Sequence, residues 1–111
     1  MCGIAGLINL GGENISPKIL KMMTDAIAHR GPDGEGHWIK DNIGLGHRRL
    51  AIIDLTESGK QPMLSKDKRF VLVFNGEIYN YREIRKELEF IGKKFIGNCD
   101  TEVLLEALIE W

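Results

Sequence analysis

The strongest constraint on the fold is that strand-like segments come in adjacent pairs between amphipathic helical segments. HWIKDNIGLGH (37–47) has a strand pattern, a turn at Asp41-Asn42 and a second strand pattern, and LAIIDL (50–55) follows as a further apolar strand. Such hairpin-like pairs favour an antiparallel or mixed sheet. We therefore expect an α+β protein whose helices pack on that sheet.

Three segments carry apolar residues at helical spacing, at positions 16–31, 80–92 and 100–111. Ser16 can cap the first helix, and Pro17 suits its first position. Asn80 and Glu83 resemble a capping box for the second helix. The apolar segments outside these helices, CGIAGLINL, RFVLVF and KKFIG, are expected to be further strands.

Composition is that of an ordinary soluble domain. The 111 residues fit one domain, with 43% hydrophobic and 28% charged side chains. A net charge of −1 gives no basic excess for nucleic acid or an anionic membrane. We see no secretory leader and no apolar run long enough to cross a membrane. Two cysteines are too few for a disulfide scaffold, so we expect free thiols and a cytoplasmic location.

Cys2 stands directly after Met1 and is followed by the small residues Gly3, Ala5 and Gly6. One interpretation is a small buried hydrophobe at the head of a strand. The other is that removal of Met1 makes Cys2 the first residue, so that a thiol and a primary amine share one carbon. An α-amine titrates near neutral pH and can act as the base for the nucleophile on its own residue. Taken alone, the residue leaves both interpretations open.

Two further motifs have a chemical and a structural interpretation. In FNGEIYN, the side-chain amide of Asn75 and the main-chain N–H of Gly76 could stabilise an oxyanion, or the pair could form a hairpin turn. In GHRRLAIID, either Arg48 or Arg49 could bind a carboxylate with two parallel hydrogen bonds, or both could be solvated at a sheet edge.

Asp100 precedes the third helical segment in NCDTEVLL. Its carboxylate could cap the free N–H groups of that helix, or it could bind the ammonium group of a ligand. Glu77, beside the Asn75-Gly76 pair, has the same two possible roles.

The histidines do not form a metal-binding pattern. His29, His37 and His47 have no neighbouring ligands at zinc-like spacing, so surface positions or ordinary hydrogen bonds are the preferred interpretation. GPDGEG lacks the Gly-Lys-Ser/Thr of a phosphate-binding loop. We expect no metal and no cofactor in this chain.

Six motifs in order complete the picture: MCGIAG, HRGPDGEG, GHRRLAIIDL, QPM, FNGEIYN and DTEVLL. Together they closely resemble the start of glutamine-hydrolysing asparagine synthetases. That start is a class II glutamine amidotransferase domain of the N-terminal nucleophile type. The resemblance extends from Met1 to the final helical segment.

This resemblance implies an activity and a set of roles. Cys2, freed of Met1, would attack the side-chain amide of glutamine, and its own α-amine would carry the proton. Asn75 and Gly76 would form the oxyanion site. The implied substrate-binding residues are Arg49 for the α-carboxylate, Asp100 for the α-ammonium with Glu77 close by, and the main chain near Leu50 and Ile52.

The resemblance also implies an αββα sandwich of antiparallel sheets. The family domain is longer than this chain, so we expect residues 1–111 to be the front portion of one domain with an incomplete sandwich. A synthetase domain using ATP and magnesium to amidate aspartate would lie outside it, and an exposed apolar face would favour a homo-oligomer. Two alternatives stay open: an inactive piece with an interaction or regulatory role, and an amidotransferase that serves another acceptor.

Overall fold

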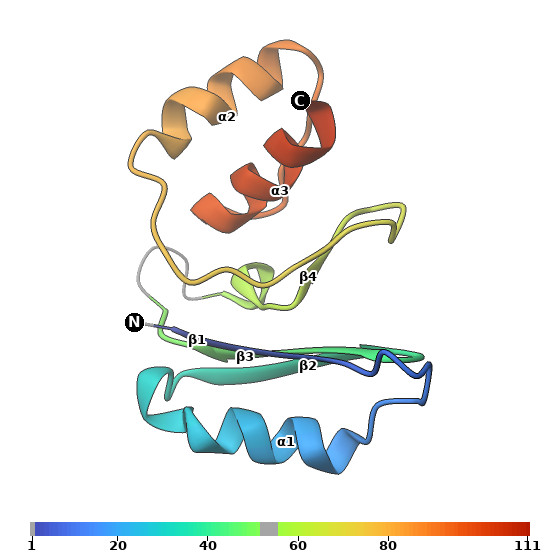
Figure 1. Ribbon diagram of the computed structural model, residues 1–111. Helices are drawn as coiled ribbons and strands as arrows, with labels where there is room; N and C mark the ends of the chain where they lie inside the picture. Colours follow the sequence, from blue (N-terminus) through green and yellow to red (C-terminus); the bar gives the residue numbers. More distant parts are fainter. Residues whose placement is uncertain (1, 52–55) are drawn as a thin grey trace.

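The computed structural model of the protein describes residues 2–51 and 56–111, in which a helix, two sheets and a pair of helices are stacked in that order (Figure 1). The first sheet consists of β1 (Gly3–Ile8), β3 (Ile43–Arg49) and β2 (Gly34–Lys40), in that order, and helix α1 (Pro17–Ala26) covers one face of it. On the other side lie the short strands β4 (Met63–Leu64) and β5 (Val71–Leu72), followed by α2 (Tyr81–Phe90) and α3 (Asp100–Glu110). We call the first sheet with α1 the first layer, and these strands and helices with the segments that connect them the second layer. The predicted α+β class and the helix–sheet–sheet–helix order are confirmed.

Both sheets are antiparallel. Strand β3 pairs with β1 and with β2, and β4 pairs with β5. The turn between β2 and β3 falls at the predicted position, where Asp41 adopts a left-handed φ of 52°. Two single turns of 3₁₀ helix, at Ala28–Arg30 and Glu57–Gly59, complete the regular elements.

Glycines let α1 approach the first sheet closely. Side chains of a strand alternate between its two faces, and Gly44 and Gly46 of β3 both face α1. A Cβ atom at Gly46 would overlap Thr24, and one at Gly44 would lie 3.0 Å from Ile15. Leu20 and Thr24, on the helix face that contacts these glycines, are fully buried.

The opposite face of the same sheet meets the second layer at Gly36 of β2. A Cβ atom there would overlap the main-chain carbonyl of Gln61, just before β4. We expect Gly36→Ala to lower the free energy of unfolding by about 1–3 kcal/mol, because the clash is with main chain that cannot rotate away. Chemical denaturation against the wild type measures this difference.

Gly11→Ala is the matched control for Gly36→Ala, because no atom lies within 4 Å of a Cβ atom at that position. Equal stability of the two variants would show that the two layers are not in close contact at Gly36.

The second layer has its own core. Met63, Cys99 and Leu105 form a buried cluster with the partly buried Leu72 and Ile109 packed against it. Leu88 of α2 and Val103 of α3 are fully buried where these two helices pack together. Hydrophobic packing thus fixes the beginning of α3 relative to β4.

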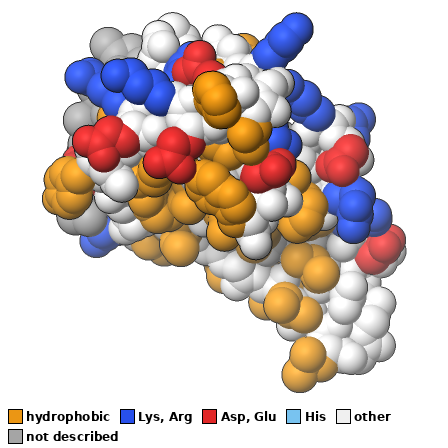
Figure 2. Space-filling model, turned by 90° about the horizontal axis from the view of Figure 1, so that it is seen from above, with side chains coloured by type: hydrophobic (Ala, Val, Ile, Leu, Met, Phe, Trp, Pro, Cys, Tyr) orange, Lys and Arg blue, Asp and Glu red, His pale blue; other side chains and the backbone are white. Residues whose placement is uncertain are grey.

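Apolar side chains are also exposed, and Figure 2 shows them between charged groups on the side of α2 and α3. Phe90 is 92% exposed and Trp111 is 72% exposed. On the first sheet, Ile8 is 60% exposed. The expected homo-oligomer stays a prediction. None of the described helices has both the length and the apolar character needed to cross a membrane.

Two sequence interpretations differ from the structure. Asn75-Gly76 does not close a hairpin, and the turn that joins β4 to β5 lies at residues 65–70 instead. There Ser65 N–H donates to Phe70 carbonyl (2.9 Å), and Asp67 accepts from the Ser65 hydroxyl and the Arg69 N–H. Side-chain hydrogen bonds with the main chain therefore select the turn.

KKFIG (93–97) is a loop rather than a strand. The Glu102 carboxylate accepts from the N–H groups of Ile96 and Gly97, and Arg85 donates to the Gly97 carbonyl. Side chains thus occupy the main-chain groups that a neighbouring strand would need. The expected strand at 50–55 begins with Leu50 and Ala51 outside any strand, and its other four residues lie outside the described part.

The predicted helix caps also differ in detail. Neither Ser16 nor Asn80 makes a side-chain capping hydrogen bond. Both helices nevertheless begin where expected, since Pro17 opens α1 and Tyr81 opens α2.

Candidate active site

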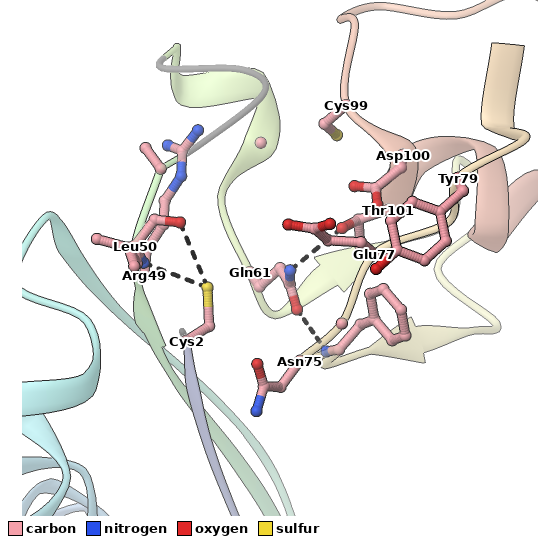
Figure 3. Close-up of a pocket in the computed structure, with 14 residues that line it drawn as sticks. Cys2, Arg49, Leu50, Gln61, Asn75, Glu77, Tyr79, Cys99, Asp100 and Thr101 are labelled. Carbon is pink, nitrogen blue, oxygen red and sulfur yellow. Dashed lines mark hydrogen bonds between the residues drawn. The ribbon is translucent and has the colours of Figure 1, made fainter.

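A pocket of about 440 Å³ opens between the two layers, and its walls come from four parts of the chain (Figure 3). These are the residue before β1, the end of β3 with residues between β3 and β4, the segment after β5, and the start of α3 with the residue before it. The lining residues are Cys2, Arg49, Leu50, Ala51, Gly59, Gln61, Phe74, Asn75, Gly76, Glu77, Tyr79, Cys99, Asp100 and Thr101.

The pocket brings together residues from both ends of the chain. Of the residues predicted for the site, the described part places these on its wall: Cys2, Arg49, Leu50, Asn75, Gly76, Glu77 and Asp100. Ile52, the remaining predicted residue, lies outside the described residues, as does Met1.

Cys2 immediately precedes β1, and its side chain lines the pocket (Figure 3). Its sulfur accepts a hydrogen bond from Leu50 N–H (3.2 Å) and lies 3.5 Å from the Leu50 carbonyl oxygen. Arg30 Nε donates to the Cys2 carbonyl at 3.2 Å. The thiol is partly exposed rather than buried, so a ligand in the pocket can reach it.

The paired arginines point to opposite faces of the first sheet, as neighbours on a strand do. Arg48 turns toward α1 and forms ion pairs with Asp25 (2.6 Å) and Glu35 (2.9 Å). The Lys21 ammonium, together with Arg48, holds the pKa of Asp25 below its usual value. Arg49 turns to the pocket, where its guanidinium donates to the Thr56 carbonyl at 2.7 Å. The interpretation of two solvated arginines is wrong for Arg48.

Asn75 and Gly76 follow β5 and line the pocket from the second layer, opposite the layer that carries Cys2. The ring of Phe74 covers Gly76, because a Cβ atom there would lie 2.8 Å from the ring. Glycine at position 76 therefore lets the main chain sit against an aromatic ring. The segment can present one side-chain amide and one main-chain N–H to the same space.

Asp100 is the first residue of α3, and its role is not the predicted helix cap. Cys99 occupies the cap position, while the Asp100 carboxylate accepts a hydrogen bond from Ile78 N–H at 2.8 Å. This bond ties the loop carrying Glu77 to α3. Asp100 is only 6% exposed, and among the described residues its second oxygen has no hydrogen-bond partner.

Sequence reasoning did not name seven of the lining residues, which are Ala51, Gly59, Gln61, Phe74, Tyr79, Cys99 and Thr101. Gln61 belongs to the quoted QPM motif, and Phe74 directly precedes Asn75. Nothing in the local pattern indicates that the Gln61 side chain accepts a hydrogen bond from Phe74 N–H. The described residues contain no group of three or more side chains arranged to hold a metal ion.

His47 is neither a surface histidine nor a fully hydrogen-bonded one, contrary to the sequence interpretation. It is 1% exposed, and its Nε2 atom has no hydrogen-bond partner among the described residues. Burial lowers the pKa of His47 from its usual 6.5, although a hydrogen bond with the main chain of Phe74 acts in the other direction. The imidazole is therefore neutral in the folded protein at neutral pH.

This burial predicts a pH dependence of stability. Below about pH 6.5 the unfolded chain binds a proton that folded His47 resists, so the free energy of unfolding should fall as the pH drops. The slope for one proton is at most about 1.4 kcal/mol per pH unit. Denaturant titrations between about pH 5 and 7.5 measure it.

The same titrations on His47→Asn supply the control. The slope should flatten in the variant, because Asp25, whose pKa is below 3.8, loses its stabilising charge only at lower pH. An identical slope in both proteins would show that another group is responsible.

Comparison with known proteins supplies the family. The family model described as "Glutamine amidotransferase domain" matches residues 1–111. Asparagine synthetase [glutamine-hydrolyzing] 1 of Bacillus subtilis is 45% identical over 95% of this chain and 17% of the relative. Asparagine synthetase [glutamine-hydrolyzing] 3 of the same organism is 40% identical over 100% of this chain and 18% of the relative.

A relative with another printed name is similar to the same extent. Amidase chry2 of Gibberella zeae is 42% identical over 95% of this chain and 17% of its own length. The chain thus spans less than a fifth of the length of each of these three relatives. Because the family model covers every residue, the chain belongs to the glutamine amidotransferase domain family of enzymes.

Proposed function

We propose that this domain hydrolyses the side-chain amide of glutamine, with Cys2 as the nucleophile once Met1 has been removed. The observation that carries the proposal is the shared pocket. A thiol, a guanidinium, an amide-bearing bend and a carboxylate from distant parts of the sequence line one cavity of about 440 Å³. An amino acid with a reactive side chain needs these groups: one cation, one anion, a nucleophile and an oxyanion site.

The proposed substrate orientation follows from charge. Arg49 binds the α-carboxylate, since a guanidinium matches a carboxylate with two parallel hydrogen bonds. Asp100 binds the α-ammonium with the carboxylate oxygen that Ile78 does not occupy, and Glu77 lies on the same wall. The side-chain amide then extends toward Cys2, between Leu50 and the Asn75-Gly76 segment.

The first half of the reaction forms a thioester. The Cys2 sulfur attacks the amide carbon of glutamine, and the thiol proton passes to the α-amine of Cys2. Negative charge develops on the amide oxygen, where Asn75 and the N–H of Gly76 stabilise it. The amine then gives the proton to the departing nitrogen, the C–N bond breaks, and ammonia leaves.

The second half regenerates the thiol. Water adds to the thioester carbon and transfers a proton to the α-amine, and the same oxyanion site stabilises the charge. The C–S bond breaks, the sulfur regains its proton, and glutamate leaves. The products are one ammonia and one glutamate for each glutamine and water consumed.

Release of glutamate and ammonia from glutamine tests the proposal. We expect turnover with glutamine by protein whose intact mass shows loss of Met1. A folded protein without Met1 that releases no glutamate would contradict the proposal and support the alternative of an inactive piece with an interaction or regulatory role.

Arg49→Lys tests the substrate orientation. We expect the KM for glutamine to rise by about tenfold with a smaller change in kcat, because a lysine ammonium cannot make two parallel hydrogen bonds to a carboxylate. Steady-state kinetics measure both constants. Arg69→Lys is the control, since Arg69 lies over the Phe70 ring away from the pocket lining. An unchanged KM in Arg49→Lys would remove Arg49 from substrate binding.

We further infer that the ammonia serves asparagine synthesis. The relatives named asparagine synthetase support this acceptor, and a synthetase domain outside this chain would use ATP and magnesium to amidate aspartate. Because one relative is named an amidase, a second candidate is that the ammonia is transferred to an acceptor other than aspartate. Adding aspartate and ATP to the natural polypeptide that carries this sequence separates the two: asparagine formation supports the first, and its absence despite glutamine hydrolysis supports the second.

A further inference from the structure

Phe74, directly before the proposed oxyanion segment, is held by buried polar side chains. Its N–H donates to the side-chain oxygen of Gln61 at 2.6 Å. Gln61 is 7% exposed, and its amide nitrogen lies 3.4 Å from the hydroxyl of Thr101. Figure 3 shows this amide between Asn75 and Thr101, with a hydrogen bond on each side. Gln61 therefore links the segment carrying Asn75 to the start of α3.

The main chain of Gln61 is itself fixed. Its carbonyl packs so closely on Gly36 that a Cβ atom there would overlap it. Because Gly36 belongs to the first sheet, the side chain of Gln61 extends from an anchored position. The hydrogen bond to Phe74 thus sets the distance between the oxyanion segment and the sheet that carries Cys2.

His47 lies beside Gly36 on the first sheet, at the place where the sheet meets Gln61. It lies directly opposite Ile4 of β1 and Gly36 of β2 in the sheet register, and its imidazole interacts with the main chain of Phe74. A buried imidazole with an unpartnered Nε2 atom is unfavourable for stability. A role in holding Phe74 gives a reason for a histidine at this position.

Phe74 transmits this restraint to Gly76. Its ring lies against the main chain of Gly76, at 2.8 Å from where a Cβ atom would be. Fixing the main chain of Phe74 therefore fixes both Asn75, which follows it, and the N–H of Gly76. Oxyanion donors act through preorganisation, so loosening this segment should weaken binding of the transition state more than binding of the substrate.

We propose that Gln61 and His47 are positioning residues that hold the Asn75-Gly76 oxyanion donors in place through Phe74. This inference rests on the proposed glutamine hydrolysis. Neither residue is assigned a contact with the substrate. Their effect should therefore appear in kcat and in the affinity for a tetrahedral adduct, and not in the KM for glutamine.

The experiment uses the natural polypeptide that carries this sequence and compares Gln61→Met with Gln61→Glu. Methionine has a similar length but no strong acceptor for Phe74 N–H, whereas glutamate keeps a carboxylate oxygen there. We expect Gln61→Met to lower kcat by about 10- to 100-fold with KM changed less than about threefold, and Gln61→Glu to recover part of that loss. Lys60→Met, at the exposed neighbouring position, is the control and should keep the wild-type kcat.

An aldehyde analogue of glutamine gives the second readout, since the Cys2 thiol adds to it to form a tetrahedral adduct. Its affinity should weaken in Gln61→Met by the same factor as kcat. His47→Asn should shift kcat and this affinity in the same direction. Circular dichroism and thermal unfolding establish that each variant is folded.

Three results would overturn the inference. One is a folded Gln61→Met with wild-type kcat and aldehyde affinity. Another is an equal loss of substrate and aldehyde affinity. The third is failure of both Gln61→Met and His47→Asn to fold, which would show a purely structural role. A wild-type protein that does not hydrolyse glutamine would instead contradict the proposed function.

Discussion

Cys2→Ala should abolish glutamine hydrolysis while the protein still binds glutamine. The proposed thioester cannot form without the sulfur, so kcat should fall by more than about 10⁴-fold. Binding should persist, because the proposed ligands of the substrate charges, Arg49 and Asp100, line the pocket independently of the thiol. Glutamate release measures the first effect, and calorimetric titration with glutamine measures the second.

Cys99→Ala is the informative comparison for Cys2→Ala, because Cys99 is the other cysteine that lines the pocket. Cys99 is buried in the cluster with Met63 and Leu105, and we expect its loss to lower stability more than turnover. If hydrolysis survived in Cys2→Ala and disappeared in Cys99→Ala, the nucleophile would be Cys99 and our assignment of Cys2 would be wrong.

Asn75→Ala should lower kcat by about 10²- to 10³-fold and leave the KM for glutamine nearly unchanged. The side-chain amide of Asn75 is proposed to bind the oxygen only after it becomes negative, so its loss affects the transition state more than the bound substrate. Steady-state kinetics on folded protein measure the two constants.

Asn80→Ala is the matched control for this substitution. Asn80 follows the same segment, is exposed, and makes no side-chain capping hydrogen bond with α2. It should retain the wild-type kcat. If Asn75→Ala raised KM and left kcat intact, Asn75 would bind the substrate rather than the oxyanion.

The parts of the fold that were predictable are those that local patterns determine. The alternation in HWIKDNIGLGH and the turn at Asp41 gave β2, β3 and their antiparallel pairing in the correct place. Apolar spacing with Pro17 gave the start of α1, although α1 ends at Ala26 and not at position 31. The extent of α2 was correct to within two residues, and Gly92, just after it, adopts a left-handed φ of 101°. These features depend on neighbouring residues, which the sequence displays directly.

The features that were missed depend on hydrogen bonds of side chains, most of them with the main chain of nearby residues. Asn75-Gly76 has strong turn propensity, yet the hairpin forms at 65–70 because Ser65 and Asp67 bind its main chain. KKFIG stays a loop because Glu102, in the next helix, binds its N–H groups. In both places, local hydrogen bonds between side chains and the main chain override the propensity of the quoted segment.

The candidate site was predictable only in part, because its contacts join residues that are distant in sequence. Motif resemblance indicated Cys2 and Arg49, and alternation along β3 explains why Arg49 and not Arg48 turns to the pocket. The contacts of Gln61 with Phe74 and Thr101 join positions 13 and 40 residues apart. No local pattern contains that information, so only the folded arrangement reveals it.

Covalent trapping at the amino terminus tests the central claim most directly. Protein mixed with glutamine is quenched in acid within one turnover, digested, and mapped by mass spectrometry. Our account predicts a γ-glutamyl thioester on a peptide that begins with Cys2 and has a free α-amine. A glutamyl group on Cys99, or glutamate release by protein that retains Met1, would contradict it.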